Sequence, residues 1–263
     1  MQEQIAKVYE AQVATYAHPE MPKPQITMMP EQVIERQPLV TAEQFTVTND
    51  YVQLQVKFPL KVISSAVHNA GMGWYNHFLN RSISSDYNIE DVKEETVQFL
   101  VERDFSLTNT VVMLTAVEAN LVAIRSFNHE RFSITVAVTA GVGNAVDVTR
   151  TYERQEAAYI GTINTWVIIN GKLSDEAFYQ AMITATEAKT KALAEEDIRD
   201  VKTNTIATGT ATDSLLIAAT QQGEEMPYAG PITDVGKYIG YGVFETTVEA
   251  IRKYKQWKNE GNG

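Results

Sequence analysis

Residues 160–195 read IGTINTWVIINGKLSDEAFYQAMITATEAKTKALAE and join a strand pattern directly to a helix pattern. The first part, residues 160–170, is rich in apolar and β-branched side chains, as strands are. The second part begins at Ser174, and two acidic residues follow in its first turn, where negative charge favours the helix dipole. A hydrophobic staple of Leu173 and Phe178 supports the same start. We therefore predict a strand over 160–170 and a helix over 174–195.

Outward from this stretch, short strands and hairpins predominate. Residues 45–47 and 52–56 alternate around Asn49-Asp50, a hairpin-turn signal, and residues 61–67 continue as a third strand. Further strands are predicted over 110–117, 121–127, 132–139 and 214–220, and further helices over 88–103 and 233–257. Because hairpins outnumber strand–helix–strand units, the pattern favours an α+β fold with a largely antiparallel or mixed sheet and three main helices.

The first 40 residues differ in composition from the rest of the chain. They hold five of the eight prolines, whereas all fourteen glycines lie at Gly71 or later. Residues 3–16 have the apolar spacing of a short amphipathic helix, and residues 17–38 read as a proline-punctuated connector. We interpret 1–40 as an arm that packs on the domain, 41–263, or on a partner subunit. A homo-oligomer with exchanged arms is left open.

Composition excludes several classes of function. With 33 acidic and 22 basic residues the net charge is −11, which argues against a nucleic-acid partner. The absence of cysteine excludes a thiol nucleophile, a thiolate metal site and any disulfide framework. No apolar run approaches the about 18–20 residues of a membrane span, and the N-terminus lacks the features of a signal peptide. We expect a soluble, cytoplasmic protein with no membrane partner.

Familiar site motifs are absent or incomplete. Gly141-Val142-Gly143 is not followed by the third glycine of a dinucleotide fingerprint, and neither a GxSxG elbow nor an HExxH motif occurs. His68 and His77 could approach each other across a loop, but the sequence offers no third ligand beside them. We therefore predict no metal site and no cofactor.

Three small polar clusters follow predicted strands. They are residues 64–71 (SSAVHNAG), 139–145 (TAGVGNA) and 208–214 (TGTATDS). Glycine allows the backbone to approach a ligand closely, and hydroxyl and amide groups supply neutral hydrogen bonds. The clusters are either tight turns whose hydroxyls are satisfied locally or the walls of one shared polar pocket.

The helix over 174–195 carries two charges of interest. Steps of 100° per residue place Lys189 within the apolar stripe of Phe178 and place Glu187 nearly opposite. In one interpretation Lys189 extends along the surface to water and Glu187 pairs with Lys191. In the other, the helix is covered on both sides and one charge faces a site. Both interpretations stay open.

Several segments together resemble the adenosylcobinamide amidohydrolase family, and the likeness covers roughly residues 45–251. The segments are 64–71, 139–145, 161–193, 207–218 and 228–251, of which 183–189 and 207–214 are the most specific. The resemblance implies hydrolysis of the amide that joins the aminopropanol arm to the corrin ring of adenosylcobinamide. The products would be adenosylcobyric acid, used in cobalamin salvage, and aminopropanol. The corrinoid would then be a substrate and not a cofactor.

Amide hydrolysis needs an activated water or nucleophile, a stabilised oxyanion and a proton for the departing amine. Without cysteine, carboxylates are the natural acid and base, and Glu187 and Asp213 lie in the most family-like segments. We predict these two as catalytic. The residues predicted to bind substrate are Ser64, Ser65, Asn69, Gly143, Asn144, Thr208, Gly209 and Thr210. Nucleophilic attack by a hydroxyl of Ser64, Ser65, Thr208 or Thr210 is the alternative mechanism.

A corrinoid pocket also needs wide apolar walls. The aromatic candidates are Trp74, Tyr75, Trp166, Tyr228 and Tyr241. Two other functions are compatible with a polar pocket of this kind. One is a corrinoid-binding or carrier protein without hydrolase activity, which would need neither Glu187 nor Asp213. The other is an amidase of a different small molecule.

Overall fold

The computed structural model describes residues 40–84, 91–152, 154 and 162–261. The chain divides into two units, Met1–Pro38 and Leu39–Gly263, and every described residue belongs to the second. The predicted arm therefore lies outside the described residues, apart from Val40. None of the described helices is long and apolar enough to cross a membrane.

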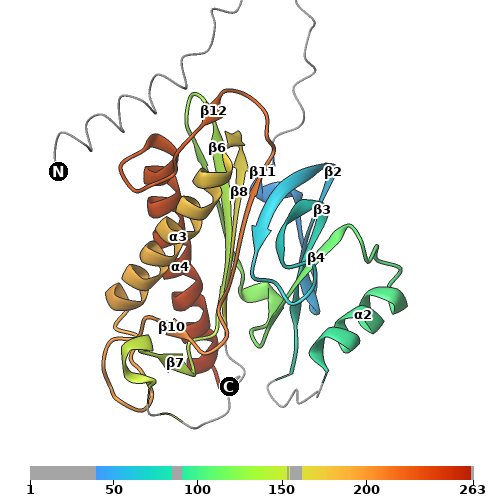
Figure 1. The fold of residues 1–263 in the computed structure, drawn as a ribbon. Coiled ribbons are helices and arrows are strands. Elements are labelled where there is room, and N and C mark those ends of the chain that lie inside the picture. Colours follow the sequence, from blue (N-terminus) through green and yellow to red (C-terminus); the bar gives the residue numbers. More distant parts are fainter. Residues whose placement is uncertain (1–39, 85–90, 153, 155–161, 262–263) are drawn as a thin grey trace, which may run out of the picture. The chain divides into compact units, whose positions relative to one another are not determined.

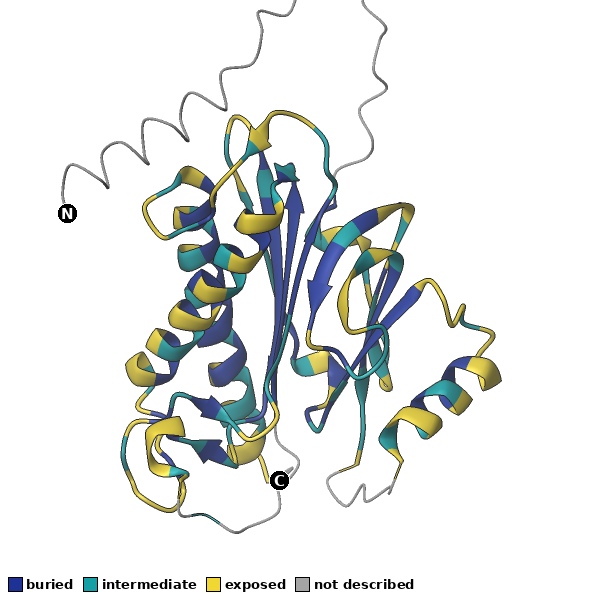
Figure 2. Cartoon of the chain, viewed as in Figure 1, coloured by how far each residue is buried: buried dark blue, intermediate teal, exposed yellow. Residues whose placement is uncertain are grey.

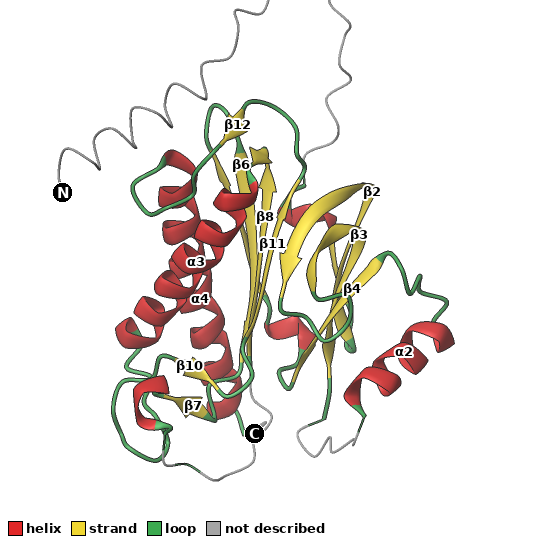
Figure 3. Ribbon diagram, viewed as in Figure 1, coloured by secondary structure: helices red, strands yellow, loops and turns green. Residues whose placement is uncertain are grey.

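The second unit is built on one large sheet (Figure 3). Its strands are β1 (Phe45–Val47), β2 (Tyr51–Ser64), β3 (Gly71–Ser82), β4 (Thr110–Thr115), β5 (Ala123–Asn128), β6 (Ser133–Ala140), β8 (Ile163–Asn170) and β11 (Ser214–Ala219). The strand order is β4-β3-β2-β11-β8-β6-β5, and β1 pairs with β2. Two smaller sheets pair β7 (Ala145–Val146) with β10 (Gly209–Thr210) and β9 (Lys172–Leu173) with β12 (Glu225–Met226).

Three α-helices accompany the described sheet. They are α2 (Val92–Glu102), α3 (Asp175–Glu195) and α4 (Asp234–Asn259), and short 3-10 helices cover Ala42–Gln44, Ala119–Leu121 and Val148–Arg150. Ser174 caps α3 and Thr233 caps α4, each accepting a backbone N–H three residues on. The predicted helices over 174–195 and 233–257 are thus confirmed. Helix α2 begins after the cap Asp91 instead of at residue 88, which lies outside the described residues.

The sheet is mixed, as predicted. Strands β3 and β4 are parallel and are connected through α2, and β8 and β11 are parallel and are connected through α3. Parallel neighbours need such a crossover, whereas the antiparallel pairs β1–β2 and β5–β6 are joined by the short turns that the sequence indicated. The α+β class is therefore confirmed.

The prediction for residues 52–67 was wrong in one respect. Strand β2 runs from 51 to 64 as one strand with an irregularity between Gln55 and Leu60, so residues 61–67 are not a separate third strand. The third strand is β3, which sequence analysis missed because its glycines were counted with the preceding polar cluster. Gly71 opens it at φ +86°, a left-handed conformation that favours glycine, and the ring of Tyr75 occupies the space beside Gly73.

The two halves of the sheet face each other across a shared core (Figures 1 and 2). Strands β2, β3 and β4 supply one side of this core, and β6, β8 and β11 supply the other. Its members include Leu54, Phe78, Met113, Trp166, Ile168 and Leu216. Helices α3 and α4 cover the outer face of the second half, and α2 covers that of the first. Every residue of β8 is buried, since the strand has the shared core on one face and α3 and α4 on the other.

Small side chains let α3 lie close to its neighbours. Five alanines along the helix are buried, at positions 177, 181, 185, 188 and 192. On α4, a Cβ at Gly242 would lie 3.0 Å from the Cδ1 of Ile134, and one at Gly236 would collide with the backbone of Gly230. These glycines therefore serve close packing, which compensates for their poor helix propensity.

Candidate functional site

A depression of about 270 Å³ lies between α3 and the adjoining ends of β8 and β11. The polar residues that line it are Ser65, Thr165, Thr186, Lys189, Asp213 and Ser214. They come from the first and third polar clusters, from β8 and from α3. The fold therefore brings together segments that are up to 150 residues apart in the chain, as the contact between Ser65 and Leu215 illustrates.

Asp213 is held at the edge of this depression by several donors. Its carboxylate accepts the backbone N–H of Ile163 at 3.0 Å, the backbone N–H of Thr210 at 3.2 Å and the hydroxyl of Thr210. It also forms an ion pair with the Nζ of Lys189. The side chains of Asp213 and Lys189 are only 18% and 14% exposed, respectively. The pair is thus largely shielded from water, and the carboxylate orientation is fixed.

Gly209 makes room for this ion pair. A Cβ at position 209 would lie 2.5 Å from Oδ2 of Asp213 and 2.9 Å from Nζ of Lys189. A side chain here would have to displace one or both of these charged groups. Gly209 also begins β10, which pairs with β7 and so joins the second and third clusters.

Four hydroxyl residues line the depression, and three of them, Ser65, Thr186 and Ser214, form hydrogen bonds within the fold; Ser214 donates to the carbonyl of Ser65 at 3.3 Å. Ser65 is exposed, and its Oγ accepts the backbone N–H of Leu215 at 3.0 Å. Thr186 donates its hydroxyl to the carbonyl of Met182 at 2.8 Å. Thr165 is buried on β8, and its Oγ1 has no hydrogen-bond partner among the described residues.

Other predicted substrate-binding residues do not line this depression. Ser64 is buried, and its Oγ accepts the N–H of Ala66 at 3.0 Å. Asn69 adopts φ +56° and donates its side-chain amide to two carbonyls, those of Leu107 and Thr110. Thr208 accepts the N–H of residue 148 at 3.0 Å. These contacts tie down turns, which is the local role that the sequence left open.

The second cluster meets the end of the last helix. Gly143 and Asn144 precede β7, and a Cβ at Gly143 would lie 2.9 Å from the Oη of Tyr254 on α4. Neither residue borders the depression. The structure thus brings the first and third clusters to one site and places these two residues outside it.

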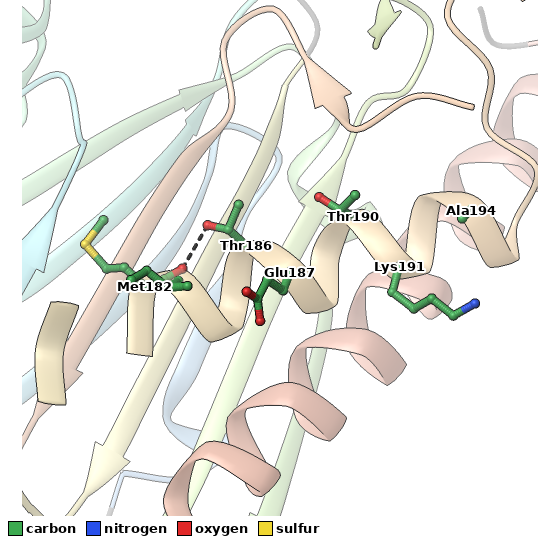
Figure 4. A pocket seen from close by; sticks show the side chains of 7 residues that line it. Met182, Thr186, Glu187, Thr190, Lys191 and Ala194 are labelled. Carbon is green, nitrogen blue, oxygen red and sulfur yellow. Dashed lines mark hydrogen bonds between the residues drawn. The ribbon is translucent and has the colours of Figure 1, made fainter. Parts of the chain in front are cut away.

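Glu187 lies on the exposed side of α3, where a shallow groove of about 640 Å³ runs along the helix (Figure 4). The groove lies between two rows of side chains spaced four residues apart, as ridges on a helix surface are. One row is Met182, Thr186, Thr190 and Ala194, and the other is Ile183, Glu187 and Lys191. The groove and the depression share Met182 and Thr186. In Figure 4 the charged ends of Glu187 and Lys191 point apart, and the described residues contain no ion pair between them.

A buried carboxylate fixes the loop that leads into Gly209. Asp200 accepts hydrogen bonds from Arg154, at 2.6 Å, and from the backbone N–H groups of Asp147, Lys202 and Thr203, at 2.7–3.0 Å. Burial acts to raise the pKa of Asp200, but these hydrogen bonds outweigh it and hold the pKa well below its ordinary value. Sequence analysis did not single out this residue.

His68 and His77 are occupied by local contacts. The Nε2 of His68 lies 2.9 Å from the carbonyl of Leu107. His77 is buried between Gln53 and Thr110, and burial lowers its pKa. Within the described ranges, no group of three or more His, Cys, Asp or Glu side chains is placed to hold a metal ion.

Trp166 corrects one expectation about the aromatic walls. It points into the core between the sheet halves, where its Nε1 lies 3.2 Å from the sulfur of Met113, and so it cannot line a surface pocket. Trp74, Tyr228 and Tyr241 are exposed. Trp74 lies on β3, which is hydrogen-bonded to β2, the strand that leads to Ser65.

Sequence reasoning named Asp213, Gly209, Thr210 and Ser65, left open whether Lys189 faces a site, and did not single out Thr165. Lys189 carried a usable signal, because a lysine within an apolar stripe must find a partner or reach water. Thr165 carried none, since threonine is common in strands.

A family model and one curated relative point to the same family. A family model described as adenosylcobinamide amidohydrolase matches residues 36–259. An adenosylcobinamide amidohydrolase from Methanosarcina mazei is 30% identical over 196 residues, which cover 73% of this chain and 90% of that protein. A Bacillus subtilis protein described as an uncharacterized ABC transporter ATP-binding protein is 24% identical over 221 residues, or 84% of this chain. This chain spans only 42% of the Bacillus protein's length.

Solved structures resemble the chain more distantly. The crystal structure of a protein from Pyrococcus horikoshii OT3 is 10% identical, with a TM-score of 0.45, over 83% of this chain and 81% of that one.

Proposed function

Because the chain belongs to the adenosylcobinamide amidohydrolase family, we propose that it hydrolyses the amide joining the aminopropanol arm of adenosylcobinamide to the corrin ring. Water adds to the amide carbonyl carbon and the C–N bond breaks. Adenosylcobyric acid and aminopropanol are released, and the acid re-enters cobalamin synthesis. The corrinoid is the substrate in this reaction. The family match over residues 36–259 is the main support.

The ion pair of Lys189 and Asp213 is the observation that supports a reaction site in the depression. A shielded ammonium group stabilises negative charge on the amide oxygen as the carbonyl is attacked, because it acts where little water competes. Asp213 accepts hydrogen bonds from Ile163 and Thr210 as well as the ion pair with Lys189, so it holds that ammonium in place. Asp213 is therefore part of the proposed site, and Lys189 joins it.

The attacking group is the second part of the proposal. Ser65 presents an exposed hydroxyl in the depression, and Glu187 borders the adjoining groove. A nucleophilic Ser65 would attack the amide carbon, and as the C–N bond breaks aminopropanol would leave with the hydroxyl proton, giving a corrinyl ester that water then hydrolyses. Glu187 would instead act as a base toward water. Loss of turnover in Ser65→Ala with normal turnover in Glu187→Gln favours the first route, and the reverse pattern favours the second.

The size of the depression limits what it accepts. Its volume of about 270 Å³ is below the ~300–1,000 Å³ typical of pockets for drug-sized ligands. We therefore propose that the amide arm enters the depression and that the corrin ring lies on the surface outside it.

Release of aminopropanol from adenosylcobinamide by the purified protein tests this function. Wild type is expected to release it, and Asp213→Asn to release it much more slowly while staying folded. Corrinoid binding without release would instead identify a non-catalytic carrier. Cleavage of simple amides, with cobinamide left intact, would identify an amidase of another small molecule.

We also propose that the protein works in the cytoplasm. The absence of cysteine from all 263 residues is compatible with a reducing compartment. The net charge of −11 suits a substrate recognised through neutral amides and apolar surface, and it disfavours nucleic acid as a partner.

A further inference from the structure

Two buried hydroxyls in the described part of the chain, those of Thr165 and Thr247, have no hydrogen-bond partner. Buried polar groups are nearly always paired, because an unpaired one has lost its bonds to water without replacement. Thr247 lies on α4 and borders none of the hollows described above. Thr165 lines the depression that holds Lys189 and Asp213.

Asp213 and Ser65, which line the same depression as Thr165, already accept hydrogen bonds from other groups. Asp213 accepts bonds from Ile163, Thr210 and Lys189, and the Ser65 hydroxyl accepts from Leu215. The strand partner directly opposite Thr165 is Leu215, whose apolar side chain offers no hydrogen bond. Thr165 is thus a buried residue that lines the depression and whose hydroxyl is bonded by no described residue.

We infer that the Thr165 hydroxyl binds the N–H of the scissile amide and so positions the amide carbonyl oxygen toward Lys189. This inference rests on the proposed function. A lysine ammonium only donates hydrogen bonds, so it must face the carbonyl oxygen of an amide. In a trans amide the N–H points away from the carbonyl oxygen, and it needs an acceptor on the other side. The Asp213 carboxylate is occupied by its own donors, whereas Thr165 has free lone pairs.

The inference makes Thr165 a specificity-determining residue for secondary amides. An ester or a tertiary amide has no N–H to donate and would leave Thr165 unpaired when water is expelled. Sites built to bond a polar group reject analogues that lack it more strongly than sites with apolar contacts do.

The test compares Thr165→Val with Thr247→Val, which removes the other unpaired hydroxyl at a position away from the depression. Thr165→Ser serves as the variant that restores the hydroxyl. The measurements are kcat and KM for aminopropanol release from adenosylcobinamide, a binding titration with the same corrinoid, and Tm. We expect kcat/KM of Thr165→Val to fall at least about tenfold, corresponding to one lost hydrogen bond. Its Tm should equal or exceed that of wild type, and Thr165→Ser and Thr247→Val should keep near-normal activity.

Three outcomes would overturn the inference. One is a Thr165→Val protein whose kcat/KM stays within about twofold of Thr247→Val, a difference well below one hydrogen bond. Another is a Thr165→Val protein that fails to fold or loses Tm in step with activity, because the hydroxyl would then be structural. The third is a wild type that neither binds nor cleaves the corrinoid, which removes the proposed function as well. A wild type that binds without cleaving removes the proposed reaction alone, and the binding titration then decides the role of Thr165.

Discussion

Asn164 and Thr165 are consecutive residues of β8, yet the fold treats their polar groups in opposite ways. Asn164 faces the core between the sheet halves, where its amide donates to Oδ1 of Asn80 at 2.7 Å and to the carbonyl of Leu114 at 2.8 Å. Its own Oδ1 accepts the hydroxyl of Thr162 at 3.1 Å. Thr165 faces the side of α3, and no described residue bonds its hydroxyl.

Burial alone does not distinguish the two residues, since Asn164 is 1% exposed and Thr165 is 2% exposed. The difference lies in what surrounds them. The Asn164 side chain belongs to a network that continues from Asn80 to Thr139 and links the two halves of the sheet. A satisfied network specifies and stabilises a fold, whereas an unsatisfied group beside a shielded ion pair is a place for a ligand. The face of β8 that carries Asn164 should therefore govern stability, and the face that carries Thr165 should govern activity.

The largest effect is expected on turnover, from a change at Lys189 on the face of β8 that carries Thr165. Lys189→Met keeps an unbranched side chain that is one atom shorter, and it removes the ammonium that the proposed oxyanion requires. Turnover of adenosylcobinamide should fall about 10²–10³-fold, as when one oxyanion donor is removed. Steady-state rates and circular dichroism would be measured together. A folded variant with turnover within about tenfold of wild type would contradict the role given to Lys189.

A loss of stability is expected from a change at Asn164, on the opposite face of β8. Asn164→Ala leaves the buried acceptors of Asn80 and Leu114 without their donor. The free energy of unfolding should fall by about 2–3 kcal/mol, which urea denaturation would measure. Thr165→Val is the matched change on the opposite face and should cost nothing. If both variants lose equal stability, the distinction between the two faces is broken.

Asp200 is another buried group with its hydrogen bonds satisfied, and its contribution to stability should be lost in acid. The folded-state pKa of Asp200 is lowered by its hydrogen bonds, so its contribution to stability is complete above the unfolded pKa of about 4 and is lost as the pH falls below it. Between about pH 4 and pH 2 the unfolding free energy of wild type should decrease more steeply than that of Asp200→Asn. Chemical denaturation at a series of pH values measures the two slopes. Parallel curves would show that Asp200 adds nothing to the acid sensitivity.

The smallest effect is expected on the pH dependence of stability, from a change at His77. Burial lowers its folded-state pKa, so the folded protein disfavours the charged form and stability is complete above the unfolded pKa of about 6.5. As the pH falls below that value, wild type should lose stability and His77→Gln should lose less. Thermal unfolding at about pH 7.5 and about pH 5.5, on either side of that pKa, gives the comparison. An equal decrease in the two proteins would mean that other groups carry the pH dependence.

Much of the architecture could be predicted because it depends on local pattern. Ser174 and its acidic first turn located α3, and alternation around Asn49-Asp50 located the first hairpin. Strand β3 escaped prediction because its two glycines look like a turn in sequence, although in the fold one packs against Tyr75 and the other opens the strand.

Only part of the site could be predicted, because a sequence displays neighbours along the chain and not contacts between distant segments. Asp213, Gly209 and Thr210 form one short segment, so a sequence can display them together. Helical projection placed Glu187 opposite the apolar stripe, and it is exposed in the structure. Lys189 meets Asp213 across 24 residues, and that contact depends on how α3 lies over β11.

The sequence by itself determined the secondary structure of β8 and α3, the mixed α+β class and the polar segment around Asp213, because each follows from neighbours along the chain. Only the tertiary structure decided which polar groups are satisfied. Alternation along β8 puts Asn164 and Thr165 on opposite faces in any fold. Whether each finds a partner depends on what packs there, since hydrogen bonds form over about 3 Å between segments that the chain connects only at long range.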